Sequence, residues 1–451
     1  MTRLFGTNGI RGVVGKDMTA DLAVRVGHAI GTHFGGGSVV LARDPRLSGP
    51  MLCRAVAAGL MASGVEVIDL GMVPTPCAQY YVHVQGRLQG GVVVTASHNP
   101  REFNGIKALD ARGMEMSREE EEAIEKIYFE ETYRIADWSA VGDLRSDGGA
   151  ADLYLRGILS RVDVEAIRKR KLTVVADPAN GAGCVTTPYL LRSLGCRVLT
   201  VNGQPDGAFP GRLPEPTIEH LGDLMRMVVD AKADVGVAHD GDADRAIFVD
   251  DRGAFLYGDK SLALLARSEL CERGGLVVTP VSTSSMLDDV VREAGGKVVR
   301  TKVGSPIVAR TMLEQGAAFG GEENGGIIFP AHQFCRDGGM TIAKMLEVLA
   351  KEGKPLSALV AALPQYSLEK AAVEVPIEKR AATLEALIGL VQGRKVETID
   401  GVKIHEPDGW VLVRPSGTEP LFRIYAEAKT PERAKALAAE GTDLVRRAIK
   451  G

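Results

Sequence analysis

The chain has 451 residues, a formal net charge of −4, and 45% hydrophobic and 25% charged residues, which is the composition of a globular protein. It has no long basic run and only 5% aromatic residues, which argues against a nucleic-acid partner. No apolar run approaches the ~18 residues needed to cross a bilayer, so we expect no membrane partner, and the length suggests about three domains.

Most of the chain alternates predicted strands with predicted helices, and this pattern occurs three times. The first pass has strands at 38–45, 65–70 and 90–94 and helices at 50–63 and 77–84. The second has strands at 171–178, 196–201 and 234–238 and helices at 180–194 and 218–231. The third has strands at 276–280, 297–301 and 317–319 and helices at 286–294 and 307–315. This alternation predicts βαβ units with largely parallel sheets and, because it repeats, three similar domains.

The last part of the chain has a different pattern. It contains predicted strands at 371–375, 410–413 and 421–425 and predicted helices at 379–392 and 430–449. We therefore predict an α/β fold class, with three similar βαβ-based mixed-sheet domains and a smaller C-terminal α+β domain. The expected domain ranges are 1–147, 148–250, 251–365 and 366–451.

The segment Thr95-Ala96-Ser97-His98-Asn99-Pro100 follows the apolar run 90–94, which reads as a buried strand. Ser97 is therefore expected at the carboxyl end of a strand, where open α/β sheets bind ligands. The nucleophile elbow of hydrolases is excluded, because it needs glycine two residues before and after the serine. An ordinary polar turn is the alternative. Lys107 could return to the same pocket as a charge stabiliser or proton carrier, although an exposed lysine is commoner.

Three carboxylates alternate along the loop 240–245, at Asp240, Asp242 and Asp244. Alternation in an extended segment points all three to one side, where they repel one another unless a cation neutralises them. Oxygen ligands of this kind favour Mg²⁺. The EF-hand loop is excluded, because its sixth and twelfth positions would be Arg245 and Asp251 instead of Gly and Glu. The alternative is a solvated acidic turn.

Two further loops carry polar groups next to glycine. Glu322 and Asn324 offer a carboxylate and an amide that suit sugar hydroxyls, although a plain glycine turn is the alternative. The range 414–418 combines a guanidinium, two hydroxyls and a glycine, which suits a phosphate; a polar hairpin loop is the alternative. Arg11 is a lone cation in a glycine-rich N-terminal segment, where a surface position is the simplest expectation.

The six cysteines are scattered and form no C-x-x-C pair. A zinc site or a disulfide framework is therefore not expected, and reduced thiols predict a cytoplasmic protein. The N-terminal segment lacks the apolar stretch of a signal peptide, in agreement with that expectation.

Four motifs occur together in a fixed order: TASHNP at 95–100, DGDADR at 240–245, GEENGG at 321–326 and RPSGTEP at 414–420. With them the whole chain resembles the α-D-phosphohexomutase superfamily. The LFGTNGIRG opening at 4–12 and the GEENGG loop are most similar to the archaeal-type branch, which contains phosphoglucosamine mutases and phosphomannomutase/phosphoglucomutases. The resemblance implies four domains around a central cleft, three alike and a fourth smaller.

The resemblance also implies a role for each matching residue. Ser97 would carry a phosphoryl group and, with Asp240, Asp242 and Asp244, would hold Mg²⁺. Glu322 and Asn324 would contact the sugar, although many relatives have serine at position 324 and histidine at position 326, where this chain has Asn324 and Gly326. The residues implied near the reacting phosphate are Arg11, His98 and Lys107, and Arg245 is expected to bind substrate and to help offset the phosphoserine charge. The residues implied at the second phosphate are Arg414, Ser416, Gly417 and Thr418.

The implied activity is that of an intramolecular phosphotransferase, an isomerase. Ser97 would give its phosphoryl group to a hexose phosphate, and the resulting 1,6-bisphosphate would turn over before Ser97 takes back the other phosphoryl group. Hexose 1,6-bisphosphate, including glucose 1,6-bisphosphate, would act as activator. We favour phosphoglucosamine mutase, with phosphomannomutase/phosphoglucomutase as the alternative and a monomer or homodimer as the expected assembly. A Mg²⁺-dependent sugar phosphatase and a non-catalytic sugar-phosphate binding protein are the competing classes.

Overall fold

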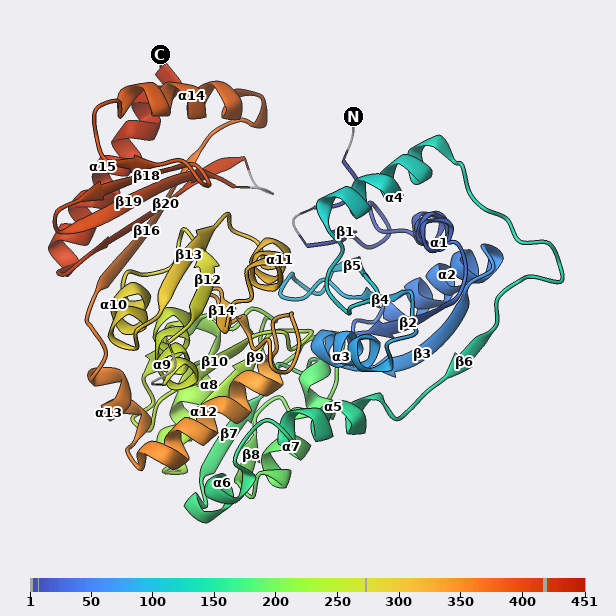
Figure 1. The fold of residues 1–451 in the computed structure, drawn as a ribbon, viewed down its shortest axis with the longest axis horizontal. Helices are drawn as coiled ribbons and strands as arrows, with labels where there is room; N and C mark the ends of the chain where they lie inside the picture. Colours follow the sequence, from blue (N-terminus) through green and yellow to red (C-terminus); the bar gives the residue numbers. More distant parts are fainter. Residues whose placement is uncertain (1–2, 7, 272–273, 417–419, 451) are drawn as a thin grey trace. The chain divides into compact units, whose positions relative to one another are not determined.

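The computed structural model describes residues 3–6, 8–271, 274–416 and 420–450 (Figure 1). The chain divides into two compact units. The first contains Met1–Ser261 and Asn324–Val360, and the second contains Leu262–Glu323 and Ala361–Gly451. The segment 324–360 therefore belongs with the N-terminal part of the chain, although it lies far from it in the sequence.

The first sheet of the first unit has six strands in the order β1-β5-β4-β2-β3-β6. They are β1 (Ile10–Val13), β2 (Ser38–Arg43), β3 (Glu66–Met72), β4 (Gly90–Val94), β5 (Phe103–Leu109) and β6 (Leu144–Ser146). The β2, β3, β4 and β6 strands are parallel, whereas β5 pairs antiparallel with β4 and β1 pairs antiparallel with β5. All five residues of β4 are buried, as its unbroken apolar sequence predicts.

The helices of this domain are α1 (Ala20–Phe34), α2 (Gly49–Ala62), α3 (Thr75–Gln85) and α4 (Arg118–Glu130). Two glycines allow α1 and α2 to approach closely. A Cβ atom on Gly59 would overlap the carbonyl oxygen of Val24, and one on Gly27 would overlap that of Val56. The two helices bury Val26, Ile30, Leu52, Val56 and Leu60 in the core of the first sheet.

The second sheet of the first unit has the order β11-β10-β9-β7-β8. Its strands are β7 (Thr173–Asp177), β8 (Arg197–Thr200), β9 (Val235–His239), β10 (Ala246–Val249) and β11 (Phe255–Leu256). The β10 strand runs antiparallel to β9, so the loop between them is a hairpin at the carboxyl end of β9. The other helices of the unit are α5 (Ala150–Leu159), α6 (Val164–Arg170), α7 (Thr187–Ser193), α8 (Gly222–Asp230) and α12 (Gly338–Glu352), and β15 (Ile327–Ile328) precedes α12.

Two predicted helices of this domain are wrong as continuous elements. The range 180–194 is a short 3₁₀ helix, η1 (Ala182–Val185), followed by α7, and the range 218–231 is η2 (Ile218–His220) followed by α8. Pro188, in the first turn of α7, has no N–H for the helix ladder, so a helix begins there more readily than it continues through. Leu221 leaves helical backbone angles between η2 and α8, with φ −102° and ψ 15°.

The second unit contains two sheets. Its first has parallel strands in the order β13-β12-β14: β12 (Leu276–Pro280), β13 (Lys297–Thr301) and β14 (Phe319–Gly321). The predicted strand at 317–319 is displaced: β14 begins at Phe319, which lies opposite Val277 of β12, while Ala318 donates from its N–H to the Leu276 carbonyl at 2.9 Å. Its helices are α10 (Met286–Glu293) and α11 (Ser305–Gln315). Two further helices, α9 (Gly258–Leu270) and α13 (Leu356–Ala361), begin in the first unit and end in the second.

The C-terminal sheet is antiparallel throughout, in the order β16-β20-β19-β18-β17. Its strands are β16 (Ser367–Glu374), β17 (Val396–Glu397), β18 (Val402–Glu406), β19 (Gly409–Pro415) and β20 (Leu421–Ala428). After the 3₁₀ turn η3 (Ile377–Lys379), the helices α14 (Arg380–Leu390) and α15 (Pro431–Lys450) pack on one face of this sheet (Figure 1).

The first three sheets share one strand order. In each, the first strand of the βαβ pattern lies between the second and the third, as in β3-β2-β4, β8-β7-β9 and β13-β12-β14. This repetition and the antiparallel fourth sheet confirm the predicted fold class of three similar mixed α/β domains and a smaller α+β domain. None of the helices in the described ranges is long and apolar enough to cross a membrane.

The contact between α1 and α2 predicts opposite effects for two glycine-to-alanine substitutions. Gly59→Ala should destabilise the protein by about 1–3 kcal/mol, because the new methyl group overlaps backbone atoms that cannot move aside. Gly389→Ala is the control: it lies in α14 with open space around it, and it should stabilise by about 0.5–1 kcal/mol. Thermal and urea unfolding of both variants would measure this, and equal stabilities would contradict the close packing.

Candidate active site

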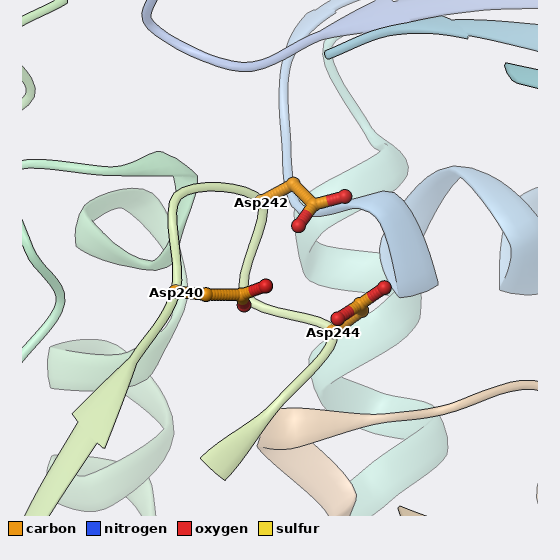
Figure 2. Close-up of side chains that lie close together, drawn as sticks. All are labelled: Asp240, Asp242 and Asp244. Carbon is orange, nitrogen blue, oxygen red and sulfur yellow. The ribbon is translucent and has the colours of Figure 1, made fainter. Parts of the chain in front are cut away.

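The loop between β9 and β10 brings three carboxylates together. Asp240, Asp242 and Asp244 are at most 2% exposed, and each offers an oxygen within 4.8 Å of the others (Figure 2). The alternative of a solvated acidic turn is therefore wrong. The three side chains face one another because the hairpin turns tightly, with Ala243 at φ 56°.

The oxygens of these carboxylates are used unequally. Oδ2 of Asp242 accepts hydrogen bonds from Thr75 Oγ1 (2.7 Å) and Lys107 Nζ (2.9 Å), and Oδ2 of Asp244 accepts from Arg336 Nη2 (2.5 Å). Oδ1 of Asp242 and Oδ1 of Asp244 are buried and accept no hydrogen bond from a described residue. Burying an oxygen without a hydrogen-bond donor is energetically unfavourable unless a cation replaces the missing donor. The donor set, oxygens only and close together, fits Mg²⁺.

The pKa values of the carboxyl groups in this loop also indicate that it lacks positive charge. Burial, together with Asp244 and Asp242, raises the pKa of Asp240 well above its usual range. Burial alone would also raise the pKa of Asp242, but Lys107 and Thr75 hold it well below the usual range. The protein's own cations thus stabilise one carboxylate of this pair more than the other, and a divalent ion would stabilise both.

Ser97 reaches this loop from the end of β4. Its Oγ donates a hydrogen bond to Oδ2 of Asp240 at 2.7 Å, and its backbone N–H donates to Thr95 Oγ1 at 2.9 Å. Ser97 has a left-handed backbone, with φ 50°, and is fully buried. A non-glycine residue in this conformation is held by its surroundings, which is common at functional sites.

His98 lies between Ser97 and Arg245. Its Nδ1 is 3.3 Å from Ser97 Oγ and 3.1 Å from Arg245 Nη2. Burial, Arg245 and Arg11 lower the pKa of His98 to about 2. Since the guanidinium can only donate, Nδ1 accepts, and the imidazole is neutral.

Two cations from other strands complete this part of the site. Lys107, on β5, is 1% exposed; burial alone would lower its pKa, but Asp242, Asp244 and Glu115 raise it, so it stays charged. Arg11, on β1, donates from Nη1 to Asn99 Oδ1 at 2.6 Å, while its buried Nε and Nη2 meet no hydrogen-bond acceptor among the described residues. The expectations of an exposed lysine and a surface arginine are therefore wrong, and the orphaned donors of Arg11 suit an anion.

The remaining predicted residues are spread over both units. Asn324 is in the first unit, where its Oδ1 accepts from the Gly326 N–H at 3.0 Å. In the second unit, Glu322 follows β14 and is 4% exposed, and Arg414, on β19, donates from Nε to Asp400 Oδ2 at 2.9 Å. The Ser416 N–H donates to the Leu421 carbonyl at 2.9 Å. Gly417 and Thr418 lie outside the described residues.

Four family models match the chain over most of its length. They are described as phosphoglucomutase/phosphomannomutase α/β/α domains I, II and III, which match residues 2–134, 152–253 and 257–366, and the C-terminal domain, which matches 370–444. The chain belongs to the phosphoglucomutase/phosphomannomutase family. It is therefore an enzyme of the phosphohexomutase class, an isomerase that transfers a phosphoryl group.

Individual relatives are similar to this chain over nearly its full length. The chain is 47% identical to "Phosphoglucomutase/phosphomannomutase" of Thermococcus kodakarensis, over 100% of both chains. It is 46% identical to "Probable phosphoglucosamine mutase" of Methanopyrus kandleri, over 100% of this chain and 99% of the relative. The crystal structure of a phosphoglucomutase/phosphomannomutase family protein from Burkholderia thailandensis superposes with a TM-score of 0.88 at 33% identity, covering 99% of this chain and 97% of that one.

Three residues at this candidate site were missed by the sequence predictions: Thr75, Arg336 and Arg46. Arg46 is 0% exposed, and its Nη2 donates to the carbonyls of Ser97 (2.9 Å) and Asn99 (2.7 Å), while its Nε donates to Asp44 (3.0 Å). It thereby holds the loop that carries Ser97. The only available signal was its position just after a strand, beside Asp44 and Pro45.

The unequal use of the carboxylate oxygens predicts the effect of Asp242→Asn. This change removes one charge and one free ligand oxygen, so Mg²⁺ binding to the metal-free protein should weaken by at least tenfold, measured by isothermal titration. Asp152→Asn, at an exposed carboxylate in the first turn of α5, is the control and should bind Mg²⁺ as the wild type does. Unchanged affinity in Asp242→Asn would exclude this loop as the metal site.

Proposed function

We propose that this phosphohexomutase carries its transferable phosphoryl group on Ser97 and interconverts hexose 6-phosphate and hexose 1-phosphate through a 1,6-bisphosphate. The observation that supports this most is the position of Ser97 Oγ, 2.7 Å from Asp240 within the carboxylate cluster. A phosphoryl group there would lie beside the proposed Mg²⁺ site, whose ion would supply the charge that stabilises its oxygens. Asp240, Asp242 and Asp244 would hold that ion together with a phosphoserine oxygen.

The transfer step needs charge stabilisation more than covalent chemistry. The P–O bond to Ser97 breaks and a P–O bond to the sugar oxygen forms. The sugar hydroxyl gives up its proton and the departing Ser97 oxygen takes one up, so that Ser97 ends as a free hydroxyl. A phosphoserine carries about −1.5 to −2 charges. Lys107, Arg11 and Arg245 are the cations available to offset that charge, and neutral His98 accepts from Arg245 at Nδ1 and so holds that cation next to Ser97.

The other predicted residues have roles away from the phosphoryl transfer. Arg414 and Ser416 would bind the phosphate that does not react, because a guanidinium pairs with phosphate in a bidentate, charge-assisted way. Gly417 and Thr418 would belong to the same loop. Glu322 and Asn324 would contact the ring hydroxyls, and their acceptor and donor groups suit a ring that binds in two orientations.

Glucosamine 6-phosphate is the sugar phosphate that we favour as substrate. Glu322 can pair with the 2-ammonium group, a charge-assisted contact that glucose and mannose lack. The Methanopyrus kandleri relative is named for this sugar, whereas the Thermococcus kodakarensis relative is named for glucose and mannose. The product would be glucosamine 1-phosphate, which supplies UDP-N-acetylglucosamine, and a hexose 1,6-bisphosphate would act as activator.

Phosphorylation of Ser97 predicts a specific loss in Ser97→Ala. The variant should fold normally but retain almost no mutase activity, and its intact mass should lack the one phosphoryl group expected on the resting wild-type enzyme. Ser139→Ala, at an exposed serine, is the matched control and should keep both activity and the phosphoryl group. Near-normal turnover in Ser97→Ala would refute the assignment. Steady phosphate release into water by the wild type would favour a phosphatase instead.

The preferred sugar is decided by kcat/KM for the 6-phosphates of glucosamine, glucose and mannose, measured with a bisphosphate activator under one condition. Specificity is the ratio of these values. We expect glucosamine 6-phosphate to have the highest value. If glucose or mannose 6-phosphate exceeds it by about tenfold, or ~1.4 kcal/mol of transition-state preference, the enzyme is a phosphomannomutase/phosphoglucomutase.

A further inference from the structure

Arg336 connects the 324–326 loop to the carboxylate cluster. It is 3% exposed, and its Nη2 donates to Oδ2 of Asp244 at 2.5 Å. On the way it passes directly over Gly326: a Cβ atom at that position would overlap Cδ of Arg336 and lie 3.0 Å from its Cγ. Glycine at 326 is therefore what lets the arginine side chain reach Asp244.

The backbone around Arg336 is held at several points. Arg336 bridges Ile328, and the Asp337 N–H donates to the Ile327 carbonyl at 3.0 Å. Asp337 accepts hydrogen bonds from Tyr154 Oη (2.5 Å) and from the Met340 N–H (2.8 Å), which caps α12. Because these bonds fix the start of the arginine side chain, its guanidinium has a defined direction.

The 324–326 loop is also hydrogen-bonded, through its backbone, to the strand that follows the carboxylate loop 240–245. The Ala246 N–H donates to the Gly325 carbonyl at 3.0 Å, two residues after Asp244. Arg336 adds a side-chain connection between the same two segments. A shift of the loop would therefore move the guanidinium, and with it the carboxylate of Asp244.

We propose that Arg336 is a positioning residue that holds Oδ2 of Asp244 so that Oδ1 faces the metal, and that it couples the 324–326 loop to metal affinity. This inference rests on the difference between the two carboxylate oxygens of Asp244. Oδ2 accepts the hydrogen bond from Arg336, whereas Oδ1 is buried and accepts no hydrogen bond from the described residues. Partners that orient metal ligands typically change metal affinity 10–100-fold when they are removed. The inference rests on the proposed metal site.

A simple counter-charge role makes the opposite prediction. If Arg336 only neutralised Asp244, its removal would leave more negative charge for the metal, and Mg²⁺ would bind more tightly. If Arg336 orients Asp244, its removal weakens binding even though a positive charge is lost. The sign of the change in Mg²⁺ affinity therefore separates the two roles.

The test is isothermal titration of Mg²⁺ into the full-length, chelator-treated, dephosphorylated protein. Arg336→Met keeps the length of the side chain without its charge and should weaken Mg²⁺ binding about tenfold or more. Gly326→Ala keeps the charge but displaces the arginine, and should weaken binding in the same direction. Arg336→Lys keeps the charge with a single donor nitrogen, and should recover part of the affinity.

The controls separate this inference from the metal site itself. Arg54→Met, at an exposed arginine of α2, should leave Mg²⁺ affinity unchanged. Asp244→Asn should abolish binding; if it does not, the proposed metal site fails. If Asp244→Asn abolishes binding while Arg336→Met binds Mg²⁺ equally or more tightly, only the positioning role is overturned. Unchanged affinity in Gly326→Ala would overturn it too, and this variant decides the question if Arg336→Met does not fold.

A steady-state measurement gives an independent readout. Because Arg336 acts through the metal ligand, saturating Mg²⁺ should restore much of the kcat of Arg336→Met. A residue needed only for folding would instead lower the melting temperature of the metal-free protein and leave the Mg²⁺ dependence of kcat unchanged. That second pattern would overturn the inference.

Discussion

Three buried carboxylates in one hairpin are the constraint on which the rest of the first unit depends. Burying a carboxylate without a partner is strongly unfavourable, and two neighbours of the same charge make it worse. Three cations offset this negative charge: Lys107 from β5, Arg245 from the same loop and Arg336 from the segment before α12. Lys107 and Arg336 come from parts of the sequence far from this loop, so the cluster can exist only when those parts are folded together.

The two domains of the first unit hold their loops in the same way. At the end of β2, Asp44 pairs with Arg46, which donates to the carbonyls of the loop after β4. At the end of β7, Asp177 pairs with Arg212 at 2.7 Å, and Arg212 donates to the His239 carbonyl at 2.6 Å. In both cases the arginine of a buried ion pair fixes backbone at the carboxyl end of the third strand of the repeat: the loop after β4 in one domain and the last residue of β9 in the other. These two loops carry Ser97 and Asp240, so the repeated anchor sets the geometry of the proposed reaction.

The segment Asn324–Val360 links the 324–326 loop to the carboxylate loop. The segment Asn324–Val360 leaves the third domain in sequence and belongs to the first unit in space. It brings Gly326 and Arg336 to the loop that carries the three carboxylates, and Asp337 accepts a hydrogen bond from Tyr154 of α5. Residues that follow Glu322 in the GEENGG motif are thus physically connected to the carboxylates. This connection is the one through which we propose that the position of the 324–326 loop influences the carboxylates.

The sequence by itself determined the repeated βαβ pattern, the position of Ser97 at the end of a buried strand and the alternation of Asp240, Asp242 and Asp244. These features are local, because apolar runs, turn residues and period-two spacing depend on neighbouring residues. The helix breaks between η1 and α7 and at Leu221, and the strand position of Arg11, were not predicted from that pattern. Arg46, Thr75 and Arg336 were decided only by the tertiary structure. They carry no motif, and their roles arise from hydrogen bonds to residues up to 167 positions away, a distance that no local pattern records.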